Sequence, residues 1–588
     1  MAPGDNGEMK ERAEQWQTET LQAQLEAMGE RKARFETDSG IPVKTLYTPL
    51  DAAERDYLES LGFPGEYPFT RGADPNMYRS RLYGTAQFTG FATPAETNQL
   101  YRRLLAQGMS SLYMACDLPC QLGYDSDDPR AEGEVGKGGV AINSMDDMET
   151  ILAGIDLART RITIVANANA PVILAMLDVV AERQGVDKAK VTGFIQNDIL
   201  KEFFARNTYI FPIDPSLRLH SDTVVFCKQA LPGFHPFNPI SYQIREAGAT
   251  AVQEAAFTLA DAATYVENAA RRGIPADELG PLYFTIIVNH RDFFEEIAKI
   301  RAMRRIWARL MKHKLGATRD EACALRFHAS QGAVGLNLTR ALPEANIARC
   351  TLAGLAGVLS GAQSVGLRTM DEAYGIPSAK ASLISLRTLQ IIAEETGVTH
   401  TVDPLAGSYL VEWLTDEVER RINGYLARIE ALGGMVSAIK AGYVQGEIAQ
   451  SAFAYERDLE EKRTITVGMN LHVDPVEEDD RHACYQLDPA LQEAQIRQLG
   501  EFKRRRDPAR LAAALQAVRE TAARPEGNDN NLMVPIKEAV KSHATLGEIV
   551  RALKDVFGEH REGSAGARKT QGGRTVRRDT AVIGPLET

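Results

Sequence analysis

The residues of this sequence that could take part in chemistry are polar side chains at the ends of apolar, β-rich runs. They are mostly amides and imidazoles with one carboxylate, namely Asp117, Asn167, Asn169, Gln196, Gln243, Asn289, His290, His328 and Gln331. Each one alone is as compatible with a structural role as with a ligand contact. The set as a whole favours a pocket that hydrogen-bonds a polar ligand.

Signatures of independent nucleophilic or metal catalysis are missing from the sequence. It contains no G-x-S-x-G, H-E-x-x-H or Walker P-loop motif, and no paired carboxylates or activated nucleophile stand out. This composition is typical of an enzyme that orients and shields its substrate while a cofactor carries out the difficult chemistry.

The elements that must position these side chains are apolar runs that alternate with longer helical stretches. The runs are 111–118, 138–142, 161–168, 191–196, 238–244, 281–288, 324–330 and 361–367. Because each is followed by a connection long enough for a crossover, the pattern favours a parallel (β/α)8 TIM barrel over an open doubly wound sheet. The polar groups at the carboxyl ends of the strands would then share one site.

The barrel is expected over residues 41–400. Residues 1–40 form an N-terminal helical arm, which is either a solvated helix or a docking element for a partner. Residues 401–562 form a helical C-terminal region that packs on the barrel, and residues 563–588 form a disordered tail because they are rich in Gly, Arg, Thr and Ser.

The overall composition excludes several classes of protein. A net charge of −12 argues against a nucleic-acid binder. No apolar run is long enough to span a membrane, and six cysteines in 588 residues are too sparse for a disulfide scaffold. We therefore expect a cytoplasmic protein that binds neither nucleic acid nor membranes.

Several segments resemble the methylmalonyl-CoA mutase family, which includes isobutyryl-CoA and 2-hydroxyisobutyryl-CoA mutases. The resemblance runs from about residue 40 to about 560, and its most specific pieces are GYDSDDP (123–129), IQNDILKEF (195–203) and DP-x-x-GSY (403–409). It implies a TIM barrel in which a CoA ester threads along the axis and undergoes a radical 1,2-rearrangement of its carbon skeleton.

The resemblance also implies the cofactor adenosylcobalamin. The family's cobalt ligand is the histidine of D-x-H-x-x-G, and the only D-x-H here, Asp480–His482, has Tyr485 where glycine is needed. We therefore expect no cobalamin-binding domain and no metal ligand in this chain. A small cobalamin-binding subunit would supply both, in a heterodimer or heterotetramer, and a GTPase chaperone could load the cofactor.

Family site residues carry over to individual positions. Gln196 matches a glutamine near the substrate carbonyl, Arg206 an arginine that pairs with the free carboxylate of methylmalonyl-CoA, and Glu372 an acid that holds the adenosyl ribose. Met77 and Arg81 match positions along the CoA path. Tyr113 and Asp117 are further candidates for substrate contact, and His328 and Gln331 are candidates for cofactor contact.

Other positions depart from the family pattern. Phe88 replaces a tyrosine beside the migrating group, and Gln243 replaces a histidine that hydrogen-bonds the thioester carbonyl; both remain catalytic candidates. Contacts to CoA or its acyl end are replaced at Gly84, Ala86, Tyr113, Leu282 and Phe284, where Tyr113 and Phe284 would add bulk to the barrel lumen. The substrate is therefore expected to differ from plain methylmalonyl-CoA, with Arg206 favouring a carboxylated or otherwise polar acyl chain.

The sequence thus predicts the large catalytic subunit of an adenosylcobalamin-dependent acyl-CoA mutase. Two alternatives stay open: a mutase that acts on an acyl group attached to another carrier, and an inactive relative that serves as a binding subunit.

Overall fold

The computed structural model describes residues 6–52, 56–85, 90, 92–106, 109, 111–332, 338–375, 377–473 and 489–561. Phe88, Ala86, the segment Asp480–His482 and the tail 563–588 lie outside the described residues.

Among these described residues, eight parallel strands form two four-stranded sheets with the orders β1-β8-β7-β6 and β2-β3-β4-β5. The strands are β1 (Gly84–Thr85), β2 (Ser111–Ala115), β3 (Arg161–Val165), β4 (Gly193–Ile195), β5 (Phe234–His235), β6 (Tyr283–Val288), β7 (Arg326–Gln331) and β8 (Ser364–Gly366). A parallel bridge between Ile240 and Thr285 links the two sheets at one seam. Joined at this seam, the sheets have the order β1-β8-β7-β6-β5-β4-β3-β2, which is the neighbour order of a (β/α)8 barrel, and the fold is of the expected α/β class.

Two of the eight strand predictions, for residues 138–142 and 238–244, are wrong. In the segment 138–142 only Val140 pairs, through bridges to Ala92 and Cys116, and a Cβ on Gly139 would lie 2.4 Å from the Cys116 backbone. Val140 thus lies between Ala92 and Cys116 and pairs with each through a single bridge, too short a pairing for a strand, and β1 supplies the eighth strand instead.

The expected strand 238–244 is replaced by β5, a single bridge at Ile240 and a short helix, α9 (Tyr242–Glu246). Pro236 and Pro239 explain the difference, because proline has no N–H to donate to a sheet ladder.

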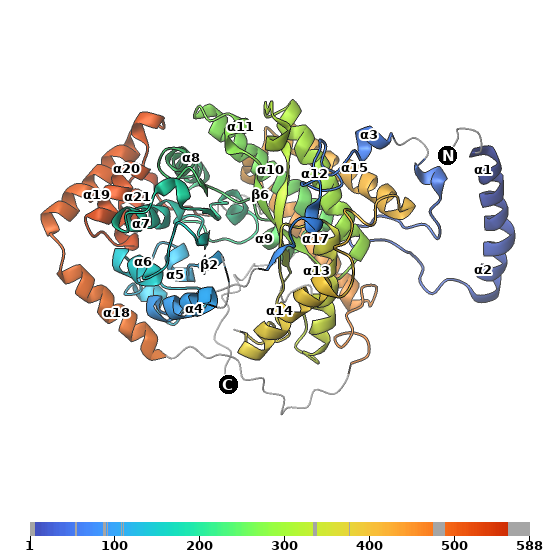
Figure 1. Cartoon of the computed structure of the whole chain (residues 1–588), viewed down its shortest axis with the longest axis horizontal. Coiled ribbons are helices and arrows are strands. Elements are labelled where there is room, and N and C mark those ends of the chain that lie inside the picture. Colours follow the sequence, from blue (N-terminus) through green and yellow to red (C-terminus); the bar gives the residue numbers. More distant parts are fainter. Residues whose placement is uncertain are drawn as a thin grey trace, which may run out of the picture.

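Helices cover the outside of both half-barrels, as Figure 1 shows for β2 and β6. The long helices are α4 (Pro94–Ala106), α6 (Met145–Leu152), α7 (Ala170–Arg183), α8 (Ile213–Ala230), α10 (Ala251–Arg271), α12 (Phe293–His313), α13 (Ala345–Leu359) and α14 (Ala379–Glu394). The short ones are α3 (Tyr57–Ser60), α5 (Leu118–Gln121), α11 (Ala276–Leu279) and the 3-10 turns η2 (Pro49–Ala52), η3 (Met77–Arg79), η4 (Pro129–Ala131), η5 (Lys188–Lys190), η6 (Leu200–Phe203), η7 (Asp320–Cys323) and η8 (Asn528–Asn530).

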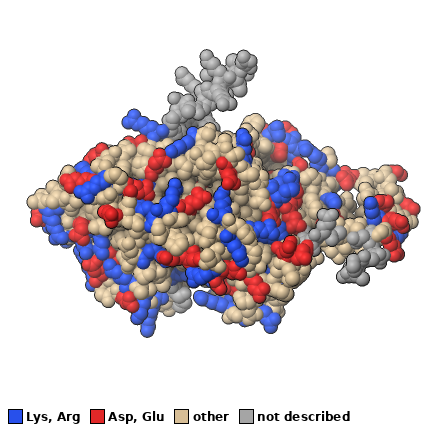
Figure 2. All heavy atoms as spheres, turned by 90° about the horizontal axis from the view of Figure 1, so that it is seen from above, with Lys and Arg blue, Asp and Glu red and all other residues tan. Residues whose placement is uncertain are grey.

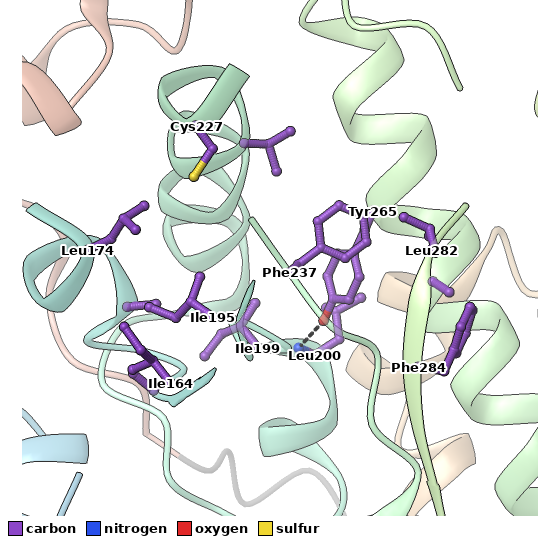
Figure 3. Packing of buried hydrophobic residues seen from close by; sticks show 14 of the residues in the cluster. Ile164, Leu174, Ile195, Ile199, Leu200, Cys227, Phe237, Tyr265, Leu282 and Phe284 are labelled. Atoms are coloured by element: carbon purple, nitrogen blue, oxygen red, sulfur yellow. Dashed lines mark hydrogen bonds between the residues drawn. The ribbon is translucent and has the colours of Figure 1, made fainter. Parts of the chain in front are cut away.

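The main core lies between the strands and these helices. Ile164 on β3 and Ile195 on β4 are fully buried, together with Leu174 on α7 and Cys227 on α8 (Figure 3). Because strand side chains alternate between faces, these apolar residues leave the intervening positions pointing into the barrel lumen.

The C-terminal region is helical and packs against the barrel helices, with α15 on α10 and α12 and α20 on α7. Its helices are α15 (Tyr409–Ala431), α16 (Met435–Lys440), α17 (Tyr443–Glu460), α18 (Pro489–Arg504), α19 (Pro508–Ala523), α20 (Met533–Lys541) and α21 (Leu546–Phe557). Asp125 of the GYDSDDP segment accepts hydrogen bonds from Thr545 Oγ1 (2.6 Å) and Gly547 N (2.8 Å). That segment therefore fixes the start of α21.

The N-terminal arm is a helical rod made of α1 (Asn6–Gln15), the π-helical turn η1 (Trp16–Leu21) and α2 (Gln22–Met28). It stands at one end of the molecule in Figure 1 and contacts η2. Its half-buried residues are Met9, Ala13, Trp16, Leu21 and Leu25. The five-residue step across η1 brings the two halves of this stripe onto one face. The docking role of the arm stays a prediction.

Buried carboxylates join the segment after the arm to α12. Glu295 is 1% exposed and accepts a hydrogen bond from Thr37 Oγ1 (2.8 Å), and the backbone N of Asp38 donates to Asp292. Burial raises the pKa of Glu295 to about 7. The folded chain therefore keeps a proton that the unfolded chain releases above about pH 4.5.

This proton gives a pH-dependent prediction for Glu295→Gln. Between about pH 4.5 and 7 the wild type should lose stability relative to the variant as the pH rises, by about 1.4 kcal/mol per pH unit. Urea denaturation of both proteins at several pH values measures the difference. Glu430→Gln, at a surface pair with Lys314 in which the Glu430 side chain is 70% exposed, should give a nearly flat difference. A flat difference for Glu295→Gln as well would contradict the prediction.

Basic and acidic side chains are interspersed over the face seen in Figure 2. Within the part of the chain that the structure describes, no helix has the length and apolar character needed to cross a membrane.

Candidate functional site

The alternation of β6 defines which side chains face the lumen. The Tyr283 hydroxyl lies 2.7 Å from Ser364 Oγ on β8, so residue 283 points inward across β7. Phe284 points outward, because its ring packs edge-on against Trp307 of α12 with centroids 5.3 Å apart. The expectation that Phe284 adds bulk to the lumen is therefore wrong, and Tyr283 provides that bulk instead. The neighbouring Leu282, 3% exposed, belongs to the hydrophobic core.

Tyr113 on β2 does face the lumen. Its neighbours Leu112 and Met114 are fully buried in the core behind the strand. Burial raises the pKa of Tyr113 to about 12, against the opposing influence of Arg368 and Arg206. The phenol is therefore neutral and lies near two guanidinium groups.

Gln196 follows β4 and is 2% exposed. Its Oε1 accepts a hydrogen bond from Asn167 Nδ2 (2.9 Å), which follows β3 and also donates to Glu202. Because Asn167 occupies the oxygen, the Gln196 amide NH2 is oriented as the donor for a ligand carbonyl.

Glu202 contacts four neighbouring residues on this side of the site. It accepts hydrogen bonds from Asn167, Lys201 and Thr208, and its Oε1 lies 3.4 Å from Arg206 Nη1. Although burial opposes ionisation, Lys201 and Arg206 lower the pKa of Glu202 to about 2. Sequence reasoning missed this carboxylate, whose signal is its place within IQNDILKEF.

Arg206 is held from three directions. Its Nη1 donates to Gln121 Oε1 (2.6 Å), Thr208 Oγ1 (2.9 Å) and, more weakly, Glu202. Its side chain remains 25% exposed. Gln121, which sequence reasoning also missed, is itself fixed by a hydrogen bond from its Nε2 to Cys116 O (2.5 Å). The guanidinium of Arg206 is thus fixed in position and remains accessible to solvent or a ligand.

A second basic centre lies at the end of β8. Arg368 stacks over the Tyr242 ring at 4.9 Å and pairs with Glu372 at 3.4 Å. Sequence reasoning did not single out Arg368. Burial raises the pKa of Glu372, while Arg368 acts in the opposite direction. Glu372 is therefore near the lumen mouth, with one cationic partner.

The two candidates on β7 are placed differently. His328 lies inward, with its Nδ1 2.9 Å from Ser364 Oγ, and burial lowers its pKa to about 4. Gln331 lies behind the strand end, where its Oε1 accepts a hydrogen bond from Arg368 N (3.0 Å) and its side chain meets the Cys350 thiol. His328 can reach a ligand in the lumen, whereas Gln331 supports the loop that carries Arg368.

Gln243 lies on α9 and not at the end of a strand. Its Oε1 is buried without a hydrogen-bond partner among the described residues. The same is true of Nδ2 and Oδ1 of Asn289, which directly follows β6. Because buried polar atoms are normally paired, these groups are suited to meet a ligand.

The remaining candidates lie outside this cluster. Asp117 caps α5, and its oxygens accept hydrogen bonds from Cys120 N (3.0 Å) and Gly136 N (2.8 Å). Met77 packs beside Gly361, just before β8, at the amino end of the barrel, and Arg81 is exposed nearby. Gly84 pairs with Ser364 in the sheet. Asp117 therefore has a structural task, while Met77 and Arg81 flank the opposite mouth of the lumen.

Among the described residues no group of three or more His, Cys, Asp or Glu side chains could hold a metal ion.

Comparisons with known proteins match most of the chain to one family. The family model described as methylmalonyl-CoA mutase matches residues 36–559. The 2-hydroxyisobutanoyl-CoA mutase large subunit of Aquincola tertiaricarbonis is 40% identical, over 96% of this chain and 99% of that protein. A methylmalonyl-CoA mutase of Rhizobium meliloti is 38% identical, over 92% of this chain and 76% of that protein. The methylmalonyl-CoA mutase large subunit of Streptomyces virginiae is 36% identical, over 93% and 74%.

Proposed function

Because the chain belongs to the methylmalonyl-CoA mutase family and is an isomerase, we propose that it is the large subunit of an adenosylcobalamin-dependent acyl-CoA mutase. The observation that carries the proposal is the linked set of Gln196, Asn167, Glu202 and Arg206 at the carboxyl ends of β3 and β4. That set presents an amide donor and a cation on one side of a barrel lumen.

In this proposal the chain binds, orients and shields the acyl group. Gln196 donates a hydrogen bond to the thioester carbonyl, and Gln243 on α9 contacts the acyl group from another side. Gln243 can donate a hydrogen bond but cannot carry a proton, unlike an imidazole. Tyr113 and Tyr283 narrow the lumen, which excludes water from a reactive intermediate.

The residues at the carboxyl mouth fit a cofactor that is held from outside. Glu372 carries acceptor oxygens beyond the end of β8, and neutral His328 lies deeper in the lumen, beside Ser364. Amide atoms of Gln243 and Asn289 have no partner among the described residues. Adenosylcobalamin supplies an organic radical when bound. Glu372 and His328 would hold its adenosyl group, while a small subunit would hold the cobalt.

The partner proposal rests on the relative whose printed name is a large subunit, because the match covers 99% of that protein. We propose a small cobalamin-binding subunit in a heterodimer or heterotetramer, with a GTPase chaperone for cofactor loading. Copurification from the native host tests this assembly.

Arg206 is proposed to select a carboxylated or otherwise polar acyl chain, since its planar guanidinium binds carboxylates well and its side chain remains accessible. Turnover of a panel of acyl-CoA esters, with adenosylcobalamin and the purified partner, identifies the substrate. Arg206→Gln should lower kcat/KM about 10- to 100-fold for a carboxylated ester and change it little for a neutral one. An unchanged rate on a preferred carboxylated substrate would remove this role.

A different acyl carrier is the second candidate, motivated by the departures at CoA-contact positions. Phe284 does not face the lumen and Leu282 belongs to the core, so these two positions support it less than Tyr113 does. Calorimetric titration of the chain with CoA and acyl-CoA separates the two candidates, because strong CoA binding excludes the other carrier. Failure to bind any thioester would favour the inactive relative.

A further inference from the structure

We propose that Asn289 is a ligand-binding residue of the barrel mouth that recognises a hydroxyl group, and this inference rests on the proposed mutase function. Asn289 is 1% exposed, yet neither end of its amide has a hydrogen-bond partner among the described residues. Burying such a group costs free energy unless a ligand pairs with it.

The position of Asn289 directs it toward the site. It directly follows β6, where Tyr283 points inward and Phe284 points outward against Trp307. Continuing that alternation by three pairs of residues brings position 289 to the lumen side, at the carboxyl end where barrel sites form. The helix α9, which carries Gln243, contacts β6.

Two polar side chains near Asn289 in the sequence or on α9 are also buried and neutral. Gln243 Oε1 and His290 Nδ1 are also buried without partners in the described part of the chain. Burial lowers the pKa of His290 to about 4, with Arg291 and Arg349 acting in the same direction, so its ring is neutral near pH 7. Beside β6 the side chains of Gln243 and His290 are therefore neutral, while the cations Arg206 and Arg368 follow β4 and β8.

The chemistry of an amide narrows the class of ligand. Oδ1 needs a donor and Nδ2 needs an acceptor, and a hydroxyl group offers both. A carboxylate would leave Oδ1 unpaired, and an ammonium would leave Nδ2 unpaired. The hydroxyl could belong to the acyl chain of the substrate or to the ribose of a nucleoside, and the two sources are separable by experiment.

Asn238 provides a matched comparison within the same barrel. It is fully buried, its Nδ2 donates to Tyr283 O, and its Oδ1 accepts from Thr285 Oγ1 (2.8 Å). Replacing a fully paired amide by leucine removes two hydrogen bonds and strands their partners, whereas the same change at an unpaired amide removes none.

The test therefore compares Asn289→Leu with Asn238→Leu in the full chain without ligands. Asn289→Leu should keep or raise the melting temperature, and Asn238→Leu should lower it by several degrees. An equal fall for both variants would overturn the proposal, because Asn289 would then be paired in the free protein. This readout does not depend on mutase activity, so it survives a failure of the proposed function.

Calorimetry with three probes then identifies the ligand. 2-Hydroxyisobutyryl-CoA and isobutyryl-CoA differ in an acyl hydroxyl, and 5′-deoxyadenosine carries ribose hydroxyls. Asn289→Leu should raise the Kd of at least one hydroxyl-bearing probe tenfold or more while leaving isobutyryl-CoA binding within about twofold. A loss for 2-hydroxyisobutyryl-CoA assigns the acyl chain, and a loss for 5′-deoxyadenosine assigns the nucleoside. Unchanged affinities, or no binding of any hydroxyl probe by the wild type, would overturn the hydroxyl assignment.

Discussion

Replacing Glu202 with glutamine is expected to lower kcat/KM of the assembled enzyme about 100-fold, because the change displaces two site residues at once. Glu202 accepts a hydrogen bond from Asn167, and Asn167 in turn orients Gln196. Glu202 also forms an ion pair with Arg206. Steady-state kinetics on the preferred thioester, with the partner subunit in excess, measures the effect.

The physical reason is that glutamine cannot replace the buried anion. Lys201 and Glu202 both have side chains with no exposed surface, and they form a direct ion pair. Without the carboxylate, the buried Lys201 keeps its charge beside Asp198, a carboxyl whose pKa burial raises to about 6. The NH2 group of the new glutamine would also point at a group that donates, either Thr208 N or Asn167 Nδ2. We therefore expect a stability loss of about 3–5 kcal/mol beside the kinetic loss.

Asp178→Asn is the matched control for this variant. Asp178 is also fully buried and pairs with Lys188 and Lys537, but it lies on α7 on the outside of the barrel. Its replacement should destabilise the chain and leave kcat/KM unchanged at a temperature where the protein stays folded. If both variants lost activity equally, the effect of Glu202 would be one of stability alone.

Replacing Arg301 with methionine should lower the free energy of unfolding by about 3–5 kcal/mol, with no direct effect on the candidate site. Arg301 is 1% exposed and pairs with Asp403 and with Glu412 (2.7 Å). It joins α12 to α15 through the DP-x-x-GSY segment, where Asp403 adopts a left-handed φ of 49°. Methionine leaves the buried Glu412 without its cation and leaves Asp403 with Arg71 alone, at 3.3 Å, so the midpoint of urea denaturation should fall.

Arg309→Met separates burial from charge in this prediction. Arg309 lies on the same helix and pairs with Glu419 at 2.6 Å, but its side chain is 44% exposed. Its loss should cost no more than about 1 kcal/mol because solvent screens the pair. Similar losses of stability for both variants would show that burying the Arg301 ion pairs does not increase their contribution to stability.

Local patterns predicted much of the architecture. Six of the eight expected strands coincide with strands of the structure, because runs such as 281–288 combine apolar alternation with β-branched residues. The two failures, 138–142 and 238–244, share one cause. Apolar composition does not reveal how many residues of a segment find ladder partners, and in both segments only one residue does, Val140 or Ile240.

The candidate site was predicted less completely. Gln196, Arg206, Tyr113, Glu372 and His328 were predicted from the sequence, and the structure places them at or near the lumen, where their roles stay predictions. Asp117 has the residue type of a ligand contact but serves as a helix cap. Gln121 and Glu202 were missed because their roles depend on contacts with Arg206 and Asn167 that form only in the folded chain.

The sequence by itself determined the family, the parallel barrel and the residue types available for binding, because these depend on local periodicity and on ordered motifs. Only the tertiary structure decided which side chains face the lumen. A shift of one residue along a strand sends a side chain to the opposite face, as Tyr283 and Phe284 illustrate. It also decided which buried polar atoms stay unpaired, because pairing depends on distant segments that meet only in the folded chain.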